Sequence, residues 1–408
     1  AKGIYLWDSS GRRLADMSSQ LVNMNLGHGN EAIIEAIKKQ AEVCCFIAPS
    51  YASEVRGELA KLLVSLLPGA FGKIFFTNGG ADANENAVKM ARMFTGRNKI
   101  FSRYRSYHGS SFGAGNLTGE PRRYALEPGV PGFVKFFDPY VYREKISFAS
   151  EKAASEYYLD KLREQVIYEN PDNVAALVLE TITGSNGVII PPEGYLAGVR
   201  EICDEFGILL ICDEVMTGFG RTGKMFAFEH YGVVPDIVTF AKGVTCGYVP
   251  LGGVAVTRDI AAYFDDHLLS CGLTYSGHPL ACAAGLACVS YYKEHGVLAN
   301  VLERGKELAE IFAALKKGHD SVGDARCIGL FGAIELVRDK TSREPLVPYG
   351  KDPDGIMKKI LGELAARGFM TYSHENMFIV APPLIITEEE LRGEMRKVDE
   401  VLDIVDRL

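Results

Sequence analysis

Continuous apolar runs of strand length punctuate the first two thirds of the chain. They occupy residues 73–77, 174–180, 207–214 and 236–241. Within each run the apolar residues are mostly consecutive instead of alternating with polar ones. That pattern is typical of parallel strands covered on both faces. It therefore predicts a buried, mostly parallel sheet.

Helical patterns lie between these runs. Residues 81–94 place apolar side chains on roughly one stripe at helical spacing. Residues 194–207 form another helical pattern that ends on a glycine, as helices often do. Alternating strands and helices predict an α/β domain with a mostly parallel central sheet and helices on both faces. We expect this large domain to span residues 36–285.

The last third of the chain has a different pattern, in which amphipathic helices alternate with short apolar runs. Thr387 and Glu390 have the spacing of a capping box at the start of the final helix. We expect a smaller α+β domain made of residues 286–408, which residues 1–35 join. The elements predicted there are a helix at 297–317, a strand at 329–337, a helix at 355–368 and an apolar run at 377–387.

Composition and charge narrow the class of protein. The chain has 408 residues with 47% hydrophobic content and a formal net charge of −8, which argues against a nucleic-acid partner. Its start resembles no signal peptide, and no apolar run reaches the length of a membrane span. Nine scattered cysteines without a CxxC pair favour a reduced, cytoplasmic chain. The histidines show no metal-binding spacing, so no metal is expected.

A glycine-rich turn follows the first predicted strand. Asn78, Gly79 and Gly80 join the strand at 73–77 to the helix at 81–94. Glycine lets the backbone approach a ligand, and the free amides at a helix start favour an anion such as phosphate. The alternative is an ordinary turn in which an aspartate caps the helix.

Two acids end the third apolar run. Asp213 and Glu214 come at the carboxyl end of the predicted strand, the edge where ligands bind open α/β sheets. The sequence GFGRTG at 218–223 matches a dinucleotide-binding pattern, which leaves a nicotinamide-dependent oxidoreductase as a distant alternative. However, the glycines do not directly follow the strand, and the residues after them start a long helix poorly. A loop is the favoured interpretation.

A single lysine follows the fourth apolar run. Lys242 has apolar or small neighbours, so its amine should lose proton affinity and become a nucleophile. Taken alone, a lysine that reaches out to solvent is the favoured interpretation. A phosphate cradle, a carboxylate and a lysine at neighbouring strand ends are together what pyridoxal phosphate (PLP) requires. The combination predicts a PLP enzyme.

These motifs resemble those of the class III (omega) aminotransferases of PLP fold type I. The similarity covers nearly the whole chain. The sequence as a whole is similar to the taurine–pyruvate aminotransferase branch. It implies the fold type I architecture, a homodimer, an amine donor and a keto-acid acceptor. The segments that carry it are 75–92, 104–111, 176–196, 209–223, 235–244 and 272–285.

The resemblance implies a role for each matching residue at the reacting end of the cofactor. Lys242 would hold the cofactor as a Schiff base and shuttle the proton. Asp213 would pair with the ring nitrogen. Val215 and Tyr107 would pack on the two faces of the ring. Glu180 would lie near the ring oxygen or the substrate.

The remaining implied roles concern the phosphate and the pocket wall. Gly79, Gly80 and Ala81 would give backbone amides to the phosphate, and Thr274 of the partner subunit would add a hydroxyl. His108 would support the pocket, although it could also be a packed histidine.

Substrate choice depends on a departure from the family pattern. Relatives that use 2-oxoglutarate usually carry an arginine shortly before Pro-Pro-Leu, whereas residues 377–380 here are all apolar. Tyr372, His374 or Arg105 could replace it. We therefore expect an ω-amine or small amino-acid donor and pyruvate as the acceptor. An amino-acid racemase, epimerase or aminomutase with the same cofactor remains the alternative.

Overall fold

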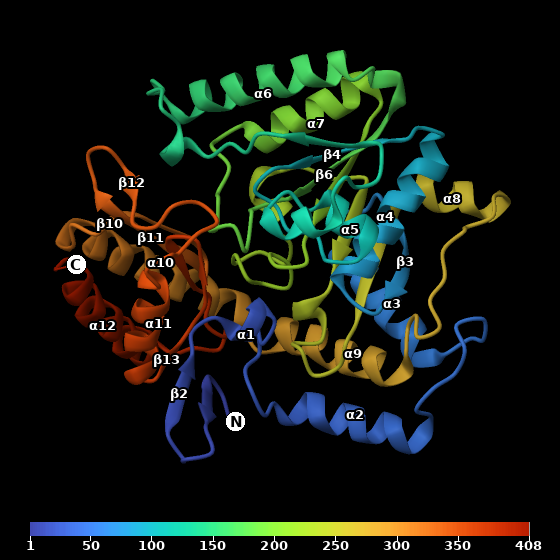
Figure 1. The fold of residues 1–408 in the computed structure, drawn as a ribbon. Coiled ribbons are helices and arrows are strands. Elements are labelled where there is room, and N and C mark those ends of the chain that lie inside the picture. The colour runs from blue at the N-terminus through green and yellow to red at the C-terminus, as the bar shows by residue number, and fades with distance from the viewer. Residues whose placement is uncertain (408) are drawn as a thin grey trace.

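The computed structural model describes residues 1–407 and contains a seven-stranded central sheet (Figure 1). The strands pair in the order β3-β9-β8-β7-β6-β4-β5. Pairing is parallel from β8 to β5, whereas β9 runs antiparallel to both of its neighbours. The predicted α/β fold with a mostly parallel sheet is confirmed. The strands are β3 (Phe71–Thr77), β4 (Lys99–Arg103), β5 (Phe133–Phe136), β6 (Val174–Glu180), β7 (Leu209–Asp213), β8 (Ile237–Phe240) and β9 (Gly252–Thr257).

The central strands are apolar throughout because both of their faces are covered. Every residue of β6, β7 and β8 is buried. Successive side chains point to opposite faces, so Leu177 and Leu179 join one buried cluster while Ala176 and Val178 join another. The apolar runs found in the sequence are therefore strands with a core on each side.

Helices supply both cores. One cluster packs the sheet against α4 (Gly80–Thr95) and α8 (Arg258–Asp266). The other packs it against α6 (Glu151–Tyr168), α7 (Tyr195–Phe206) and α9 (Pro279–Glu294). The helices predicted at 81–94 and 194–207 are α4 and α7, which confirms both. The other helices of this part are α1 (Ser19–Val22), α2 (Glu31–Val43), α3 (Glu54–Leu66) and α5 (Phe112–Leu117).

The register of the parallel strands aligns three polar residues at one edge. Glu180 at the end of β6 pairs with Asp213 at the end of β7, which pairs with Thr239 in β8. Parallel strands end at the same edge, where open α/β sheets bind ligands. The fold thus places these polar groups in one row next to Lys242, which follows β8.

The C-terminal part forms a smaller sheet covered by helices (Figure 1). Its order is β10-β11-β15-β14, and β12 pairs with β11. The capping box predicted at Thr387 and Glu390 is present at the start of the last helix. The elements are α10 (Val297–Gly318), β10 (Val322–Ile328), β11 (Phe331–Asp339), β12 (Glu344–Pro345), α11 (Ile356–Ala366), β14 (Ser373–His374), β15 (Met377–Val380) and α12 (Glu388–Val405).

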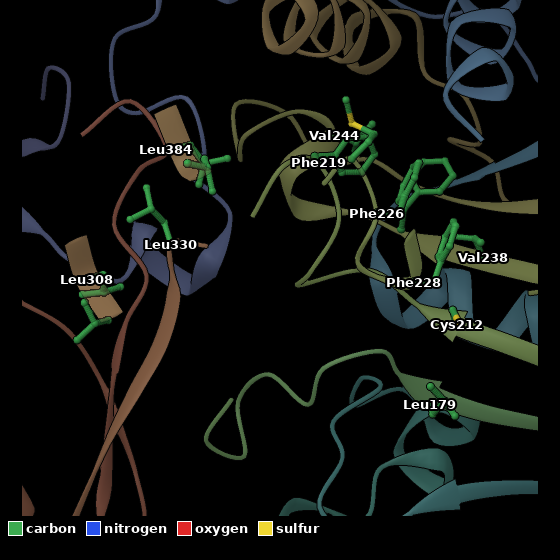
Figure 2. Close-up of a cluster of buried hydrophobic side chains, with 14 of the residues drawn as sticks. Leu179, Cys212, Phe219, Phe226, Phe228, Val238, Val244, Leu308, Leu330 and Leu384 are labelled. Carbon is green, nitrogen blue, oxygen red and sulfur yellow. The ribbon is translucent and has the colours of Figure 1, made fainter. Parts of the chain in front are cut away.

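The N-terminal residues share a sheet with the C-terminal part. Strands β1 (Tyr5–Trp7) and β2 (Arg13–Asp16) join β13 (Phe369–Met370). One cluster of buried side chains also continues from Leu179 in β6 to Leu384, as Figure 2 shows. The division into residues 36–285 and the rest stays a prediction.

None of the helices in the described part of the chain has the length and apolar character needed to cross a membrane.

Candidate active site

A cavity of about 410 Å³ lies at the carboxyl edge of the central sheet. Of the cofactor-site residues predicted from the sequence, Thr274 alone does not line it. Thr274 is exposed in the segment between α8 and α9. The structure therefore brings the other candidates together around one space. They are Gly79, Gly80, Ala81, Tyr107, His108, Glu180, Asp213, Val215 and Lys242.

The start of α4 forms one wall of the cavity. Gly79 is the cap residue of this helix, and no side chain caps its first turn. The first backbone amides are therefore available to a ligand, and the helix dipole favours an anion there. A Cβ atom on Gly80 would lie 2.9 Å from Val215 Cγ1, so the close approach to Val215 requires glycine. This wall suits a phosphate group.

Asp213 is held by donors on both of its carboxylate oxygens. Its Oδ1 accepts a hydrogen bond from the Val215 amide at 3.0 Å. Its Oδ2 lies 2.7 Å from His108 Nδ1 and accepts from Asn84 Nδ2 at 2.7 Å. Only 3% of Asp213 is exposed. Both oxygens thus have hydrogen-bond partners that hold the carboxylate at the cavity wall.

Glu180 is a second buried carboxylate beside Asp213. Its Oε1 accepts from the Tyr107 amide at 3.0 Å, and its Oε2 accepts from the Gly184 amide at 2.7 Å. Burial raises the pKa of Glu180, and the nearby Asp213 acts in the same direction. The side chain thus holds the Tyr107 backbone against the cavity.

Lys242 faces these two carboxylates from the turn after β8. Its backbone has a φ of +45°, a conformation that is uncommon for residues other than glycine. The Tyr292 hydroxyl donates to the Gly243 carbonyl at 2.8 Å and holds this turn against α9. Burial lowers the pKa of the Lys242 ammonium to about 8, although Asp213 and Glu180 oppose the shift. With a pKa of about 8, roughly a fifth of the amine is neutral at about pH 7.4.

Glu214 lies next to Asp213 but has a different environment. It is fully buried, and four donors surround its carboxylate: the Thr181 and Thr217 hydroxyls and the Ala227 and Phe228 amides. Glu214 does not line the cavity. It ties the segment after β7 to the sheet edge.

The GFGRTG segment is a loop that bridges parts of the fold. Turns follow β7, and the next element is the short 3₁₀ helix Ala227–Tyr231. No long helix follows the glycines, so the dinucleotide-binding interpretation is wrong. Arg221 in this loop is fully buried and donates to the carbonyls of Leu330 and Pro382. It also donates to Ser19 and Asn25 near the N-terminus.

An arginine missed in the sequence lies beside Tyr107 of the cavity wall, in a neighbouring pocket that we call the mouth of the site. The Arg122 guanidinium stacks on the Tyr107 ring, with its Cζ atom 3.8 Å from the ring centroid. It pairs with Glu120, which is buried, and His374 Nδ1 lies 3.8 Å from the same carboxylate. The charge of Arg122 reaches the cavity, since it lowers the pKa of Lys242. Arg122 is therefore the cation beside the aromatic wall.

The groups proposed as substitutes for the missing arginine lie outside the cavity lining. Arg105 pairs with Glu375 at 3.4 Å and contributes to a separate cavity. Tyr372 is mostly shielded from solvent, and burial raises its pKa. Burial also lowers the pKa of His374. A role for any of the three in binding a substrate carboxylate stays a prediction.

Asn84 and Thr239 were also missed. Asn84 lies four residues after Gly80, so it is one helical turn further along the same face of α4. That spacing could have identified it. Thr239 and Arg122 carried no such signal, because their positions depend on strand register and on loop packing.

The lining groups fit PLP. The uncapped start of α4 suits its phosphate, and Asp213 suits a protonated ring nitrogen. Lys242 provides an amine of lowered pKa for its aldehyde. Three distinct chemical groups of one cofactor thus find matching partners around one cavity.

A possible metal-binding group lies elsewhere. Among the described residues, His319, Asp403 and Asp406 could together hold an ion. None of these residues lines the cavity.

Known proteins resemble the whole chain. The family model described as aminotransferase class-III matches residues 1–402. A solved taurine:2-oxoglutarate aminotransferase from Bifidobacterium kashiwanohense, in complex with PLP and glutamate, is 54% identical with a TM-score of 0.98. That match covers 100% of this chain and 92% of the other. An (S)-enantioselective omega-transaminase from Thermomicrobium roseum is 37% identical with a TM-score of 0.94, covering 99% and 91%.

A curated relative agrees with these structures. Taurine–pyruvate aminotransferase from Bilophila wadsworthia is 32% identical, over 100% of this chain and 92% of the relative. Fold and site together define a PLP-dependent transferase. The chain belongs to the class-III aminotransferases.

Proposed function

We propose that this aminotransferase moves an amino group from an ω-amine or small amino acid of the taurine type to a keto acid. The observation that carries the proposal is the convergence of Lys242, Asp213 and the uncapped start of α4 on one cavity. The donor class is supported by two relatives that are both named for taurine.

Bound PLP supplies an aldehyde that combines with amines and a ring that accepts electrons. The amides of Gly79, Gly80 and Ala81 would bind its phosphate. Asp213 would keep the ring nitrogen protonated by holding a negative charge beside it. Val215 and Tyr107 would contact the two faces of the ring, which orients it between the strand ends and the mouth.

Lys242 Nζ is the group that moves the proton. With a pKa of about 8, this amine can both take up and release a proton near neutral pH. It would remove the proton from the substrate carbon that bears nitrogen, and it would return a proton when the amino group is transferred. Glu180 would keep the Tyr107 backbone in place during both steps.

The acid group of the substrate would bind to Arg122. A guanidinium recognises a sulfonate or carboxylate through charge-assisted hydrogen bonds. Arg122 stacks on Tyr107, which lines the cavity, and about half of its side chain is exposed. It can therefore reorient toward a substrate without leaving a buried site.

The acceptor is a keto acid, and we propose 2-oxoglutarate with pyruvate as the alternative. The prediction of pyruvate rested on the absence of an arginine before the Pro-Pro-Leu segment. Arg122 offers a cation from another part of the chain, so that reason no longer excludes a dicarboxylate. The Bifidobacterium relative is named for 2-oxoglutarate and the Bilophila relative for pyruvate.

A half-reaction screen tests the proposal. Taurine, β-alanine, putrescine and alanine are added singly to the holoenzyme, and the absorbance of the bound cofactor is followed. The aminated enzyme is then treated with pyruvate or 2-oxoglutarate. We expect taurine to react fastest among the donors and 2-oxoglutarate to restore the starting spectrum faster. Lack of reaction with every acidic donor would contradict the proposal.

The same screen separates the racemase, epimerase or aminomutase alternative. Those enzymes need no keto acid and leave no net carbonyl product. If alanine were racemised without release of pyruvate, the alternative would be correct.

We also propose a cytoplasmic homodimer in which Thr274 of the partner subunit completes each site. Its support is the exposed position of Thr274 away from the cavity of its own chain. Mixing the Lys242→Ala and Thr274→Asp variants tests it, because a mixed dimer would regain one intact site. Mixed subunits that form dimers but stay inactive would contradict the shared site.

A further inference from the structure

We infer that Asn84, oriented by Thr239, is a positioning residue that sets the direction and charge of the Asp213 carboxylate. The inference rests on the proposed role of Asp213 as partner of the ring nitrogen. It does not depend on which donor or acceptor the enzyme uses.

Asn84 has a fully satisfied amide in the layer behind Asp213. Its Nδ2 donates to Asp213 Oδ2 at 2.7 Å and to the His108 carbonyl at 2.8 Å. Its Oδ1 accepts from the Thr239 hydroxyl at 2.8 Å. Asn84 is only 1% exposed. Both hydrogens and the oxygen of the amide therefore have fixed partners.

The partners allow only one orientation of the amide. A carboxylate and a carbonyl accept hydrogen bonds and cannot donate them, so the Asn84 nitrogen must face Asp213 and His108. The opposite side then needs a donor, which is the Thr239 hydroxyl. Thr239 lies beside Asp213 in the register of β7 and β8. The sheet itself thus fixes the orientation of a side chain on α4.

The arrangement divides the work between the two oxygens of Asp213. Asn84 and His108 both engage Oδ2, whereas Oδ1 accepts a hydrogen bond from the Val215 amide. Each oxygen of a carboxylate can accept about two hydrogen bonds, so Oδ1 keeps capacity for a donor in the cavity. Asn84 therefore engages Oδ2 and leaves an acceptor position of Oδ1 for a ligand in the cavity that Asp213 lines.

An aspartate could not replace the amide. Its charge would oppose Asp213 directly, and neither carboxylate could donate a hydrogen bond to the other unless one of them took up a proton. The other titratable groups that face Asp213 are His108, Glu180 and Lys242. Asn84 differs from these groups because it carries no charge and donates a hydrogen bond to Asp213.

Cofactor affinity of the holoenzyme is the first measurement. We expect Asn84→Ala to weaken PLP binding about tenfold or more, since a hydrogen bond to a charged group is lost. Thr239→Val should weaken it about threefold, because the amide loses the donor that orients it, while Thr239→Ser should stay within about twofold of wild type. Asn84→Asp should be at least as defective as Asn84→Ala.

The absorbance of the bound cofactor is the second measurement. A carboxylate that accepts fewer hydrogen bonds attracts the ring proton more strongly, so the ring withdraws fewer electrons. The absorbance of the bound cofactor is followed as a function of pH. We expect the pH at which half of the absorbance change has occurred to be higher in Asn84→Ala and in Thr239→Val than in the wild type. Thr239→Ser should restore the wild-type midpoint.

Thr181→Val is the matched control. It removes another buried hydroxyl that donates to a carboxylate, but the acceptor is Glu214. Glu214 takes no part in the hydrogen bonds that run from Thr239 through Asn84 to Asp213. It should lower the melting temperature and leave both cofactor measurements unchanged. If Asn84→Ala and Thr239→Val behaved like this control, the inference would be overturned.

Asp213→Asn separates this inference from the proposed role of Asp213. If Asp213→Asn changed cofactor affinity and midpoint while the Asn84 and Thr239 variants did not, only the positioning role would fail. If Asp213→Asn also left both unchanged, the proposed role of Asp213 would fail with it.

Discussion

The sheet edge and the mouth of the active site are built in different ways. At the sheet edge, Asp213 and Glu180 are buried and held largely by backbone amides and fixed side chains. At the mouth, Arg122 is about half exposed and is held by stacking on Tyr107 and by its pair with Glu120. A rigid polar edge suits a cofactor that must keep one orientation. A more exposed cation suits substrates that enter and leave.

Removing Lys242 tests the rigid end most severely. Lys242→Ala should lower kcat/KM by roughly 10⁴-fold or more, because losing a group that acts directly in the chemical step has effects of this size. Steady-state assays with the preferred donor and acceptor measure it. Lys224→Ala, at an exposed lysine directly after the GFGRTG segment, is the control and should behave like wild type. Near-normal turnover by Lys242→Ala would exclude its assigned role.

Removing the charge at the mouth should have a smaller effect of a different kind. Arg122→Gln should raise KM for taurine about 10- to 100-fold and change kcat less, because a charge-assisted hydrogen bond to the substrate is lost. Arg105→Gln is the matched control, since Arg105 also pairs with a glutamate but stacks on Tyr140 and Tyr349, which do not line the cavity. A larger rise in KM for Arg105→Gln than for Arg122→Gln would show that Arg105, and not Arg122, binds the acid group of the substrate.

The pH dependence of cofactor attachment examines the environment of Lys242. Because the neutral amine is the reactive form, the rate of PLP binding to the apoenzyme should rise as pH increases through about 8 and then level off. Below that midpoint the rise should approach about tenfold per pH unit. Stopped-flow absorbance between pH 6 and pH 10 measures it. A midpoint near the ordinary lysine value of 10.5 would show that burial does not affect this amine.

The smallest expected change concerns the acid that does not face the cavity. Glu214→Gln should lower the free energy of unfolding by about 1–3 kcal/mol, because its amide nitrogen would face donors instead of accepting from them. Urea unfolding at fixed PLP concentration measures it. Glu389→Gln, at an exposed glutamate on α12, should change stability by less than about 0.5 kcal/mol. An equal effect of both variants would contradict the assigned role of Glu214.

Much of the rigid end was predictable from local patterns. The predicted strand at 174–180 is β6, and Asp213 ends β7 as expected. Gly80 begins α4 directly after the turn that follows β3. These features depend on residues close together in the chain, whose apolar runs and turn residues determine the local backbone.

The mouth was not predictable in the same way. The arginine was sought near residues 377–380, whereas the structure places Arg122 on Tyr107. That contact joins two loop segments, and loop conformation depends on packing that no periodic pattern encodes. Asn84 could have been found by helical spacing, but its link to Thr239 could not.

The sequence by itself determined the cofactor chemistry: a lysine after one strand, an aspartate at the end of another and a glycine-rich helix start. Each of these follows from neighbouring residues that build a strand, a turn or a helix. Tertiary structure decided the rest. Strand register aligned Glu180, Asp213 and Thr239. Burial lowered the pKa of Lys242, because desolvation depends on every element that packs around the amine.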